Sequence, residues 1–217
     1  MAKILQAVIL GAPASGKGTI SSRIVKSFDV IHLSSGDILR GHIENQTDYG
    51  VRVKSTIEKG LLVPDDLMVT LIENELKHIH RKSWILDGFP RTRVQAEMLS
   101  TKVKLDFVIN LVVDFDVLID RIKGRWVHLP SGRVYHSEFN PPIVPGKDDI
   151  TGEDLVQRSD DNAKSLHKRL SLYSEKIPPV IEFYKESKLL HNFHGKTSNE
   201  IWPKVYSFIA QFLKEEN

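Results

Sequence analysis

LQAVILGAPASGKGT, residues 5 to 19, decides the fold of this chain. The apolar run Leu5–Leu10 leads directly into G-x-x-x-x-G-K, and an amphipathic stretch, Lys17–Phe28, follows. A strand before the motif and a helix after it are the context in which this motif is a phosphate-binding loop. Its backbone N–H groups surround phosphate oxygens, the helix N-terminus adds positive potential, and the lysine reaches the β- and γ-phosphates. We therefore expect a triphosphate site here.

Short apolar runs alternate with helix-periodic stretches along the rest of the chain. Continuous apolar strands separated by helices indicate a parallel sheet covered on both faces. The sequence thus predicts an α/β three-layer sandwich of the P-loop NTPase type, with ligands at the carboxyl ends of its strands. The candidate strands are Leu5–Leu10, Val30–Leu33, Trp84–Leu86, Phe107–Val113 and Leu189–Phe193, and the candidate helices between them are Lys17–Phe28, Arg93–Leu99, Val117–Ile122 and Ile201–Leu213.

Two segments interrupt the alternation of strands and helices. The first contains three helical patterns without a strand, Asp37–Asn45, Tyr49–Lys59 and Asp65–Leu76. The second runs from about Arg125 to Asp161 and combines four prolines with the pattern of a small β unit. We expect both to be insertions that lie over the carboxyl edge of the sheet.

The composition excludes several classes of protein. A length of 217 residues with 41% hydrophobic residues fits one domain with insertions. The net charge of +2 gives no general attraction to nucleic acid or to an anionic membrane, so phosphate binding must come from local clusters of Arg and Lys. Because cysteine is absent, disulfides, thiolate nucleophiles and cysteine-bound zinc are excluded. No apolar run is long enough for a membrane span, and the first one starts by Ile4, so no cleavable presequence is expected.

A second group of motifs suits another phosphate. The run Trp84–Asp87 is an apolar strand that ends in an acid, which suits a magnesium-positioning partner for Thr19. It continues into Gly88–Thr92, and upstream Leu33–Arg40 places hydroxyls and an arginine at a helix start. A regulatory GTPase is disfavoured, because there is no N-K-x-D element and the only D-x-x-G lies within the proline-rich segment.

In this order and spacing, the motifs resemble the adenylate kinase family over nearly the whole chain. The resemblance also includes residues 120–125, Gly132–Tyr135, Phe139–Pro142, Thr151–Glu153, Gln157–Asp161 and the helix bearing Arg169. It implies one nucleoside monophosphate kinase domain, in which the γ-phosphoryl group of a magnesium-bound triphosphate is transferred to AMP. The core would comprise residues 1–33, 64–125 and 162–217, with a helical AMP-binding insertion at 34–63 and a small β lid at 126–161.

The resemblance also implies the role of each site residue. AMP would be bound by Ser35, Arg40, Leu61, Leu62, Val63, Gly88, Arg91, Gln95, Arg158 and Arg169. The triphosphate would be bound by Ala14, Ser15, Gly16, Lys17, Gly18, Thr19, Arg121, Arg125, Val134, Tyr135 and Thr197, with Mg²⁺ at Thr19 and Asp87. The catalytic group would be Lys17, Asp87, Arg91, Arg125, Arg158 and Arg169. Arginine grips phosphate through parallel N–H bonds, and a glutamine amide can read an adenine edge. The attacking phosphate oxygen is already anionic, so no general base is needed.

Two parts of the chain, the lid and the phosphate-binding loop, depart from patterns found in the family. Where some members hold zinc in the lid with four cysteines, this chain has His128, Ser131, Asp148 and Thr151. These groups can form a hydrogen-bond network instead, and no zinc is expected. In the phosphate-binding loop, Ala14 stands where relatives usually have glycine, so the backbone there must permit an alanine.

The donor base is the open question. The tail HNFHGKTSNEIWP, residues 191 to 203, is similar to that of mitochondrial GTP:AMP phosphotransferases, as are Arg125-Trp126 and Pro178–Glu182. This favours GTP as the donor and the mitochondrial matrix as the location, with an ATP:AMP enzyme and a cytoplasmic location as alternatives. A monomer is expected, without nucleic acid or membrane partners. An inactive nucleotide-binding regulatory module is disfavoured by the retained charged residues, and a UMP or CMP kinase by Gln95.

Overall fold

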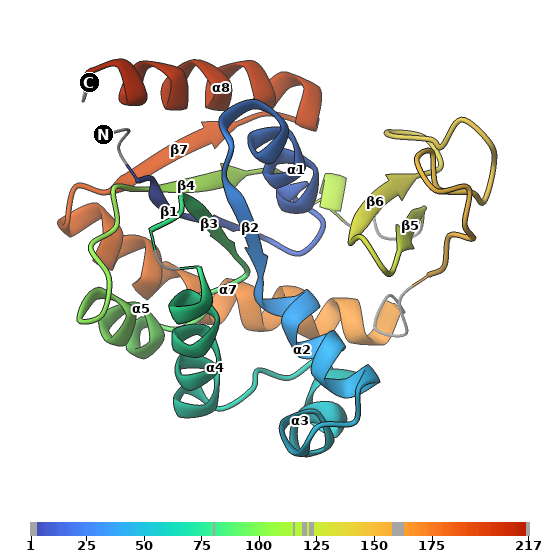
Figure 1. Cartoon of the computed structure of the whole chain (residues 1–217), viewed down its shortest axis with the longest axis horizontal. Helices are drawn as coiled ribbons and strands as arrows, with labels where there is room; N and C mark the ends of the chain where they lie inside the picture. Colours follow the sequence, from blue (N-terminus) through green and yellow to red (C-terminus); the bar gives the residue numbers. More distant parts are fainter. Residues whose placement is uncertain are drawn as a thin grey trace.

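The computed structural model describes residues 4–79, 81–114, 116–118, 121, 124–157 and 163–215. Its centre is a five-stranded parallel sheet in the order β2-β3-β1-β4-β7 (Figure 1). The strands are β1 (Gln6–Gly11), β2 (Ile31–Ser34), β3 (Trp84–Asp87), β4 (Phe107–Val112) and β7 (Leu190–His194). Each predicted strand is confirmed with its bounds within one residue.

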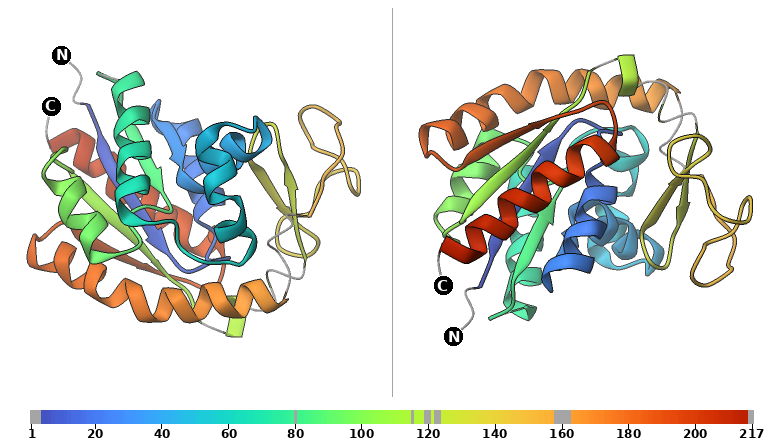
Figure 2. Two further views of the ribbon diagram at one scale, coloured as in Figure 1. Left: turned by 90° about the horizontal axis from the view of Figure 1, so that it is seen from below. Right: turned by 90° about the horizontal axis from the view of Figure 1, so that it is seen from above.

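Helices cover both faces of the sheet (Figure 2). One face carries α1 (Lys17–Phe28) and α8 (Ser198–Glu215), and the other carries α4 (Asp65–His78), α5 (Arg93–Ser100) and α7 (Ala163–Glu186). Alternate residues of β1 belong to different cores, because successive side chains of a strand point to opposite faces. Ala7 and Ile9 pack on the α1 and α8 side, whereas Val8 and Leu10 pack on the other. The predicted three-layer sandwich is therefore confirmed.

Most helix predictions are confirmed, but α8 is longer than predicted and the full length of α7 was not predicted. The helix α1 has the predicted bounds, whereas α8 begins three residues earlier than predicted, at Ser198. The helix α7 is 24 residues long and continues through Pro178 and Pro179, which obscure a helical pattern because proline disfavours a helix interior. Of the predicted stretch Val117–Ile122, residues 117, 118 and 121 are helical and the rest lies outside the described residues.

The two insertions lie at the carboxyl ends of the strands (Figure 1). The first contains α2 (Ser35–Glu44) and α3 (Asp48–Glu58), which pack on each other. The second, described over residues 125–157 and called the lid segment below, contains the antiparallel pair of β5 (Arg125–His128) and β6 (Arg133–His136). Among the described helices, none is both long and apolar enough to cross a membrane.

Candidate active site

The phosphate-binding loop joins β1, the central strand, to α1. Ala14 has φ +64° and Gly16 has φ +93°, both in the left-handed region, so the loop reverses tightly. Alanine adopts that region at a cost of about 1–2 kcal/mol. No side chain caps the start of α1, because its N-cap is Gly16. The first N–H groups of the helix are thus open to an anion.

Lys17 is held inside the phosphate-binding loop. Its ammonium donates to the carbonyl oxygens of Gly11 at 2.9 Å and Ala12 at 3.0 Å. Burial lowers the pKa of Lys17 to about 8; Asp87 works against this, while three neighbouring arginines lower the pKa further. Those arginines are Arg91, Arg169 and Arg125, in decreasing order of effect. The positive charges of Lys17 and of these three arginines therefore lie close enough to act on one another.

Asp87 ends β3 directly beside the loop. Sheet register aligns it with Ile9 of β1 and with Ser34 of β2. Burial raises the pKa of Asp87, but a hydrogen bond from His32 at 3.3 Å and the charge of Lys17 outweigh burial, and the pKa is lowered overall. Asp87 is therefore held as a carboxylate. His32 was missed by sequence reasoning, because its contact depends on strand pairing across 55 residues.

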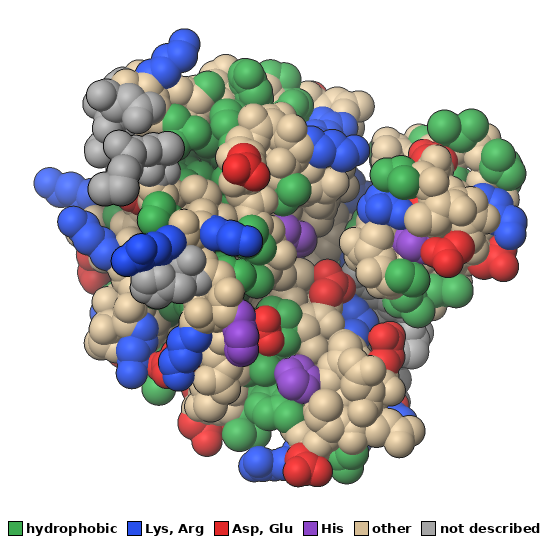
Figure 3. All heavy atoms as spheres, in the orientation of Figure 1, with side chains coloured by type: hydrophobic (Ala, Val, Ile, Leu, Met, Phe, Trp, Pro, Cys, Tyr) green, Lys and Arg blue, Asp and Glu red, His purple; other side chains and the backbone are tan. Residues whose placement is uncertain are grey.

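The predicted triphosphate residues line one cavity of about 420 Å³ between the core and the lid segment. This volume lies in the range of small-molecule sites. A groove in the surface separates the lid segment from the rest of the molecule (Figure 3). The lining includes Ala14, Gly16, Lys17, Gly18, Thr19, Arg121, Arg125, Val134, Tyr135 and Thr197, together with Asp87. Ser15 alone of the predicted set is absent from the lining, since it is fully buried within the loop.

The predicted AMP residues line a second, smaller cavity. Its lining includes Arg40, Leu61, Leu62, Val63, Gly88, Arg91, Gln95 and Arg169. Ser35 lies buried nearby, and its hydroxyl has no hydrogen-bond partner among the described residues. Arg158 lies outside the described residues. Arg40, Gly88, Arg91 and Arg169 line both cavities, so the two candidate sites meet at a cluster of arginines.

Gln95 is fixed by contacts at both ends of its amide. Its Oε1 accepts from the backbone N–H of Arg91 at 2.7 Å, and its Nε2 donates to Asp65 at 2.8 Å. Thr92, the N-cap of α5, also donates to Asp65, at 3.0 Å. One N–H and one oxygen lone pair of Gln95 remain for a base. The role of Asp65 was not predicted, because it lies 30 residues from Gln95 in the sequence.

The site offers few ligands of its own to a metal. Thr19 and Asp87 both line the larger cavity. Within the described ranges, no group of three or more His, Cys, Asp or Glu side chains could hold an ion. Mg²⁺ characteristically binds to one or two carboxylates, to substrate phosphates and to water. The residues present therefore fit a magnesium ion that arrives with the triphosphate.

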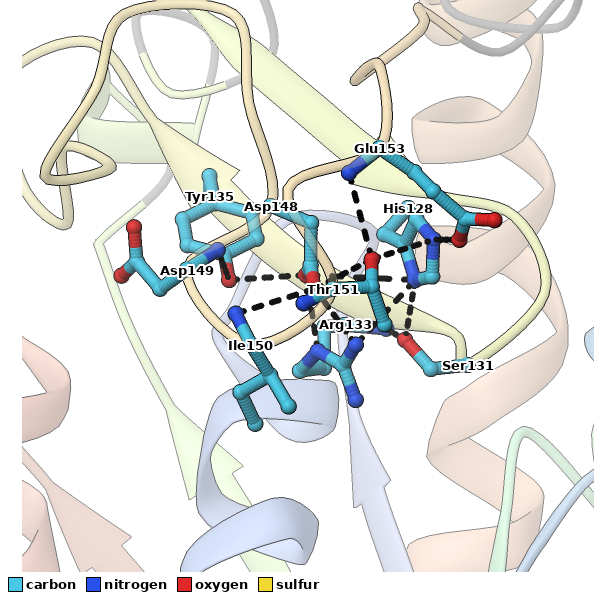
Figure 4. A network of polar contacts seen from close by, with 9 residues as sticks. All are labelled: His128, Ser131, Arg133, Tyr135, Asp148, Asp149, Ile150, Thr151 and Glu153. Atoms are coloured by element: carbon cyan, nitrogen blue, oxygen red, sulfur yellow. Dashed lines mark hydrogen bonds and ion pairs between the residues drawn. The ribbon is translucent and has the colours of Figure 1, made fainter.

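The lid segment is organised around a buried carboxylate (Figure 4). Asp148 accepts from Arg133 through Nε at 2.8 Å and Nη2 at 2.6 Å, and from the Tyr135 hydroxyl at 2.9 Å. It also accepts from the Thr151 hydroxyl at 3.0 Å. The Arg133 guanidinium holds the pKa of Asp148 well below its usual range. Asp148 is therefore ionised throughout the ordinary pH range.

The remaining predicted lid positions join the same network. His128 pairs through Nδ1 with the Ser131 hydroxyl at 2.7 Å and through Nε2 with Glu153 at 2.5 Å. The hydroxyl of Thr151 lies 3.3 Å from His128 Nε2 and links the two halves. Arg133 and Glu153 were not predicted as members, although both lie in quoted motifs. Side-chain contacts thus connect the two loops of the lid segment, in addition to the backbone pairing of Val127 with Val156.

Comparisons with known proteins agree with this geometry. A model of the adenylate kinase family matches residues 9–189. The chain is 48% identical over 207 residues to the protein named "GTP:AMP phosphotransferase, mitochondrial" of Drosophila melanogaster, covering 95% of this chain and 96% of that protein. It is also 44% identical over 210 residues to "Adenylate kinase 4" of Oryza sativa subsp. japonica, covering 94% and 86%.

Proposed function

This chain belongs to the adenylate kinase family, and we propose that it transfers the γ-phosphoryl group of Mg-GTP reversibly to AMP, giving GDP and ADP. It is a nucleotide phosphotransferase by family. One observation carries the proposal: the two cavities share Arg40, Gly88, Arg91 and Arg169. Two nucleotides that meet at these residues would bring their phosphates together at the junction.

The proposed reaction uses charge and position rather than a covalent intermediate. An oxygen of the AMP phosphate attacks the γ-phosphorus, and the bond to the β-phosphate oxygen breaks. The transition state spreads negative charge over three equatorial oxygens, so fixed positive groups stabilise it. We assign this role to Lys17, Arg91, Arg125 and Arg169, whose charges act on one another in the structure. Arg158 is assigned the same role from the family motif.

We assign AMP to the smaller cavity and the donor to the larger one. Residues 34–63 then form the AMP-binding insertion, residues 126–161 form the lid, and the other residues form the core. Thr19 and Asp87 would hold Mg²⁺, which neutralises charge on the β- and γ-phosphates when it is bound. The groove between the lid and the core must close during the reaction, since water would otherwise accept the phosphoryl group.

The choice of GTP rests on the tail at residues 191–203 and on the activity named for the fruit-fly relative. The same relative supports a mitochondrial location for this chain, and we propose the matrix. We also propose a monomer, because the apolar faces of the described sheet are covered by helices of the same chain.

A coupled assay of the purified protein tests the proposal. ATP, GTP and ITP are each paired with AMP, CMP and UMP in the presence of Mg²⁺. We expect the highest kcat/KM for the GTP and AMP pair. Comparable rates with UMP and AMP would overturn the acceptor, and a clear preference for ATP would overturn the donor. No turnover with any pair would support the inactive module instead.

A further inference from the structure

Arg23 of α1 holds the first two residues of α8. Its Nη1 donates to the carbonyl oxygen of Ser198 at 3.2 Å, and its Nη2 donates to Oδ1 of Asn199 at 2.6 Å. These two residues lie 175 and 176 positions from Arg23 in the sequence. All three residues line the larger cavity, beside the phosphate-binding loop. The pair of Arg23 and Asn199 is therefore part of the donor site and is not only a link between helices.

The arginine determines which way the Asn199 amide points. A guanidinium has five donors and no acceptor, so the amide must turn its oxygen toward Arg23. The Nδ2 amine then faces away from Arg23. It has no hydrogen-bond partner within the part of the chain that the structure describes. Arg23 itself uses two of its donors in the described contacts. The pair thus presents the N–H groups of Nδ2 and of the guanidinium to a ligand, beside one remaining lone pair of Oδ1.

A planar guanidinium and an aromatic ring lie together in the same cavity, where a nucleotide base could stack. The Arg121 guanidinium lies over the ring of Phe139, with its central carbon 5.5 Å from the ring centroid. Arg121 also donates to the carbonyl oxygens of Lys196 and, at 3.2 Å, of Ala14. It therefore connects the phosphate-binding loop with the loop that leads into α8. A base placed against the Arg121 face would have its edge near residues 196–199.

We propose that Asn199, oriented by Arg23, distinguishes guanine from adenine in the donor nucleotide. The O6 and N7 atoms of guanine are acceptors and suit the N–H groups of the pair. Adenine keeps N7 but carries an N6 amine in place of O6, so a donor would face a donor. This inference rests on the proposed function, because it presumes that the donor is GTP.

Three substitutions test the inference. Asn199→Asp keeps the bond from Arg23 but replaces the free amine by an acceptor, which suits adenine. Asn199→Ala removes the donor without adding an acceptor. The control is Asn74→Asp on α4, where the exposed Asn74 Oδ1 likewise accepts from a cation, Lys77, at 3.4 Å and lies outside both cavities.

The readouts are the dissociation constants for the analogues GMPPNP and AMPPNP with Mg²⁺, and kcat/KM for GTP and ATP with AMP. The ratio between the two bases cancels the general repulsion that a new carboxylate exerts on phosphates. We expect Asn199→Asp to shift this ratio about 10- to 100-fold toward adenine. Asn199→Ala should shift it less, and Asn74→Asp should leave it unchanged. Thermal unfolding should be similar in all four proteins.

The two proposals fail in different ways. If the wild-type protein prefers GTP and the ratio for Asn199→Asp stays within about twofold of wild type, the role of Asn199 is overturned. The proposal that GTP is the donor would then still stand. A wild-type preference for ATP would overturn both. If Asn199→Asp shifts the ratio but also loses much thermal stability, the role of Asn199 is still supported when Asn199→Ala shifts the ratio at normal stability.

Discussion

Triphosphate binding should weaken as the pH rises through 8, because Lys17 takes up a proton when the phosphates bind. Burial, aided by nearby arginines, lowers the pKa of Lys17 from 10.5 to about 8. Negative phosphate oxygens beside the ammonium favour its charged form, so binding raises the pKa again. A group whose pKa rises on binding takes up protons when the complex forms. The affinity for the nucleotide therefore falls as the pH rises.

The size of the effect follows from the two pKa values. A full return from about 8 to 10.5 is worth about 3.4 kcal/mol of binding. Relative to pH 7, the association constant should be about twofold lower at pH 8 and about tenfold lower at pH 9. Binding at pH 8 should take up about half a proton for each nucleotide.

Isothermal titration calorimetry with GMPPNP and Mg²⁺ between pH 7 and 9 measures both quantities. Buffers with different ionisation enthalpies give the number of protons that are taken up. The control is Lys17→Arg, whose guanidinium stays charged throughout and should remove the pH dependence. An affinity that is flat between pH 7 and 9 in the wild type, with no proton uptake at pH 8, would refute the reasoning.

Three further predictions concern separate parts of the molecule. Arg91→Ala should raise the KM for AMP about 10- to 100-fold while the donor dissociation constant changes far less, and equal loss of both in steady-state kinetics would mean that Arg91 is wrongly assigned. Asn in place of Asp148 should lower the melting temperature by several degrees, because Arg133 loses its carboxylate partner. In the same calorimetric scan, EDTA should leave the wild-type transition unchanged, and a shift would reveal a structural metal. Ala14→Gly should raise the free energy of unfolding by roughly 0.5–1 kcal/mol in urea titrations, because the φ of +64° costs an alanine more than glycine loses in the unfolded state; an unchanged or lower value would contradict this.

The sheet could be predicted closely from the sequence because its signals are local. Strands buried on both faces appear as continuous apolar runs, and Phe107–Val112 is a clear example. The helix α7 could not be delimited, since Pro178 and Pro179 lie inside it and packing against α5 and β7 keeps it continuous. Local propensity is a weak guide where tertiary contacts decide.

The candidate site could be predicted as a set of residues but not as a set of contacts. Motif matches grouped Gln95 with the residues that line the smaller cavity, but did not indicate the two bonds that fix its amide. The same holds for Arg23, whose partners lie at the other end of the chain. Such contacts arise only when distant segments meet, so nothing in the local sequence around either partner shows them.

The strand order β2-β3-β1-β4-β7 also has an evolutionary consequence. The proposed acceptor site lies next to β2 and β3, whereas the start of α8, with Asn199, follows β7 at the opposite edge. The catalytic loop after β1 lies between them. Under the proposed function, substitutions near Asn199 in one copy of a duplicated gene would change the donor base while the acceptor site and the catalytic loop stay unaltered. Divergence at one edge leaves the other under its own selection.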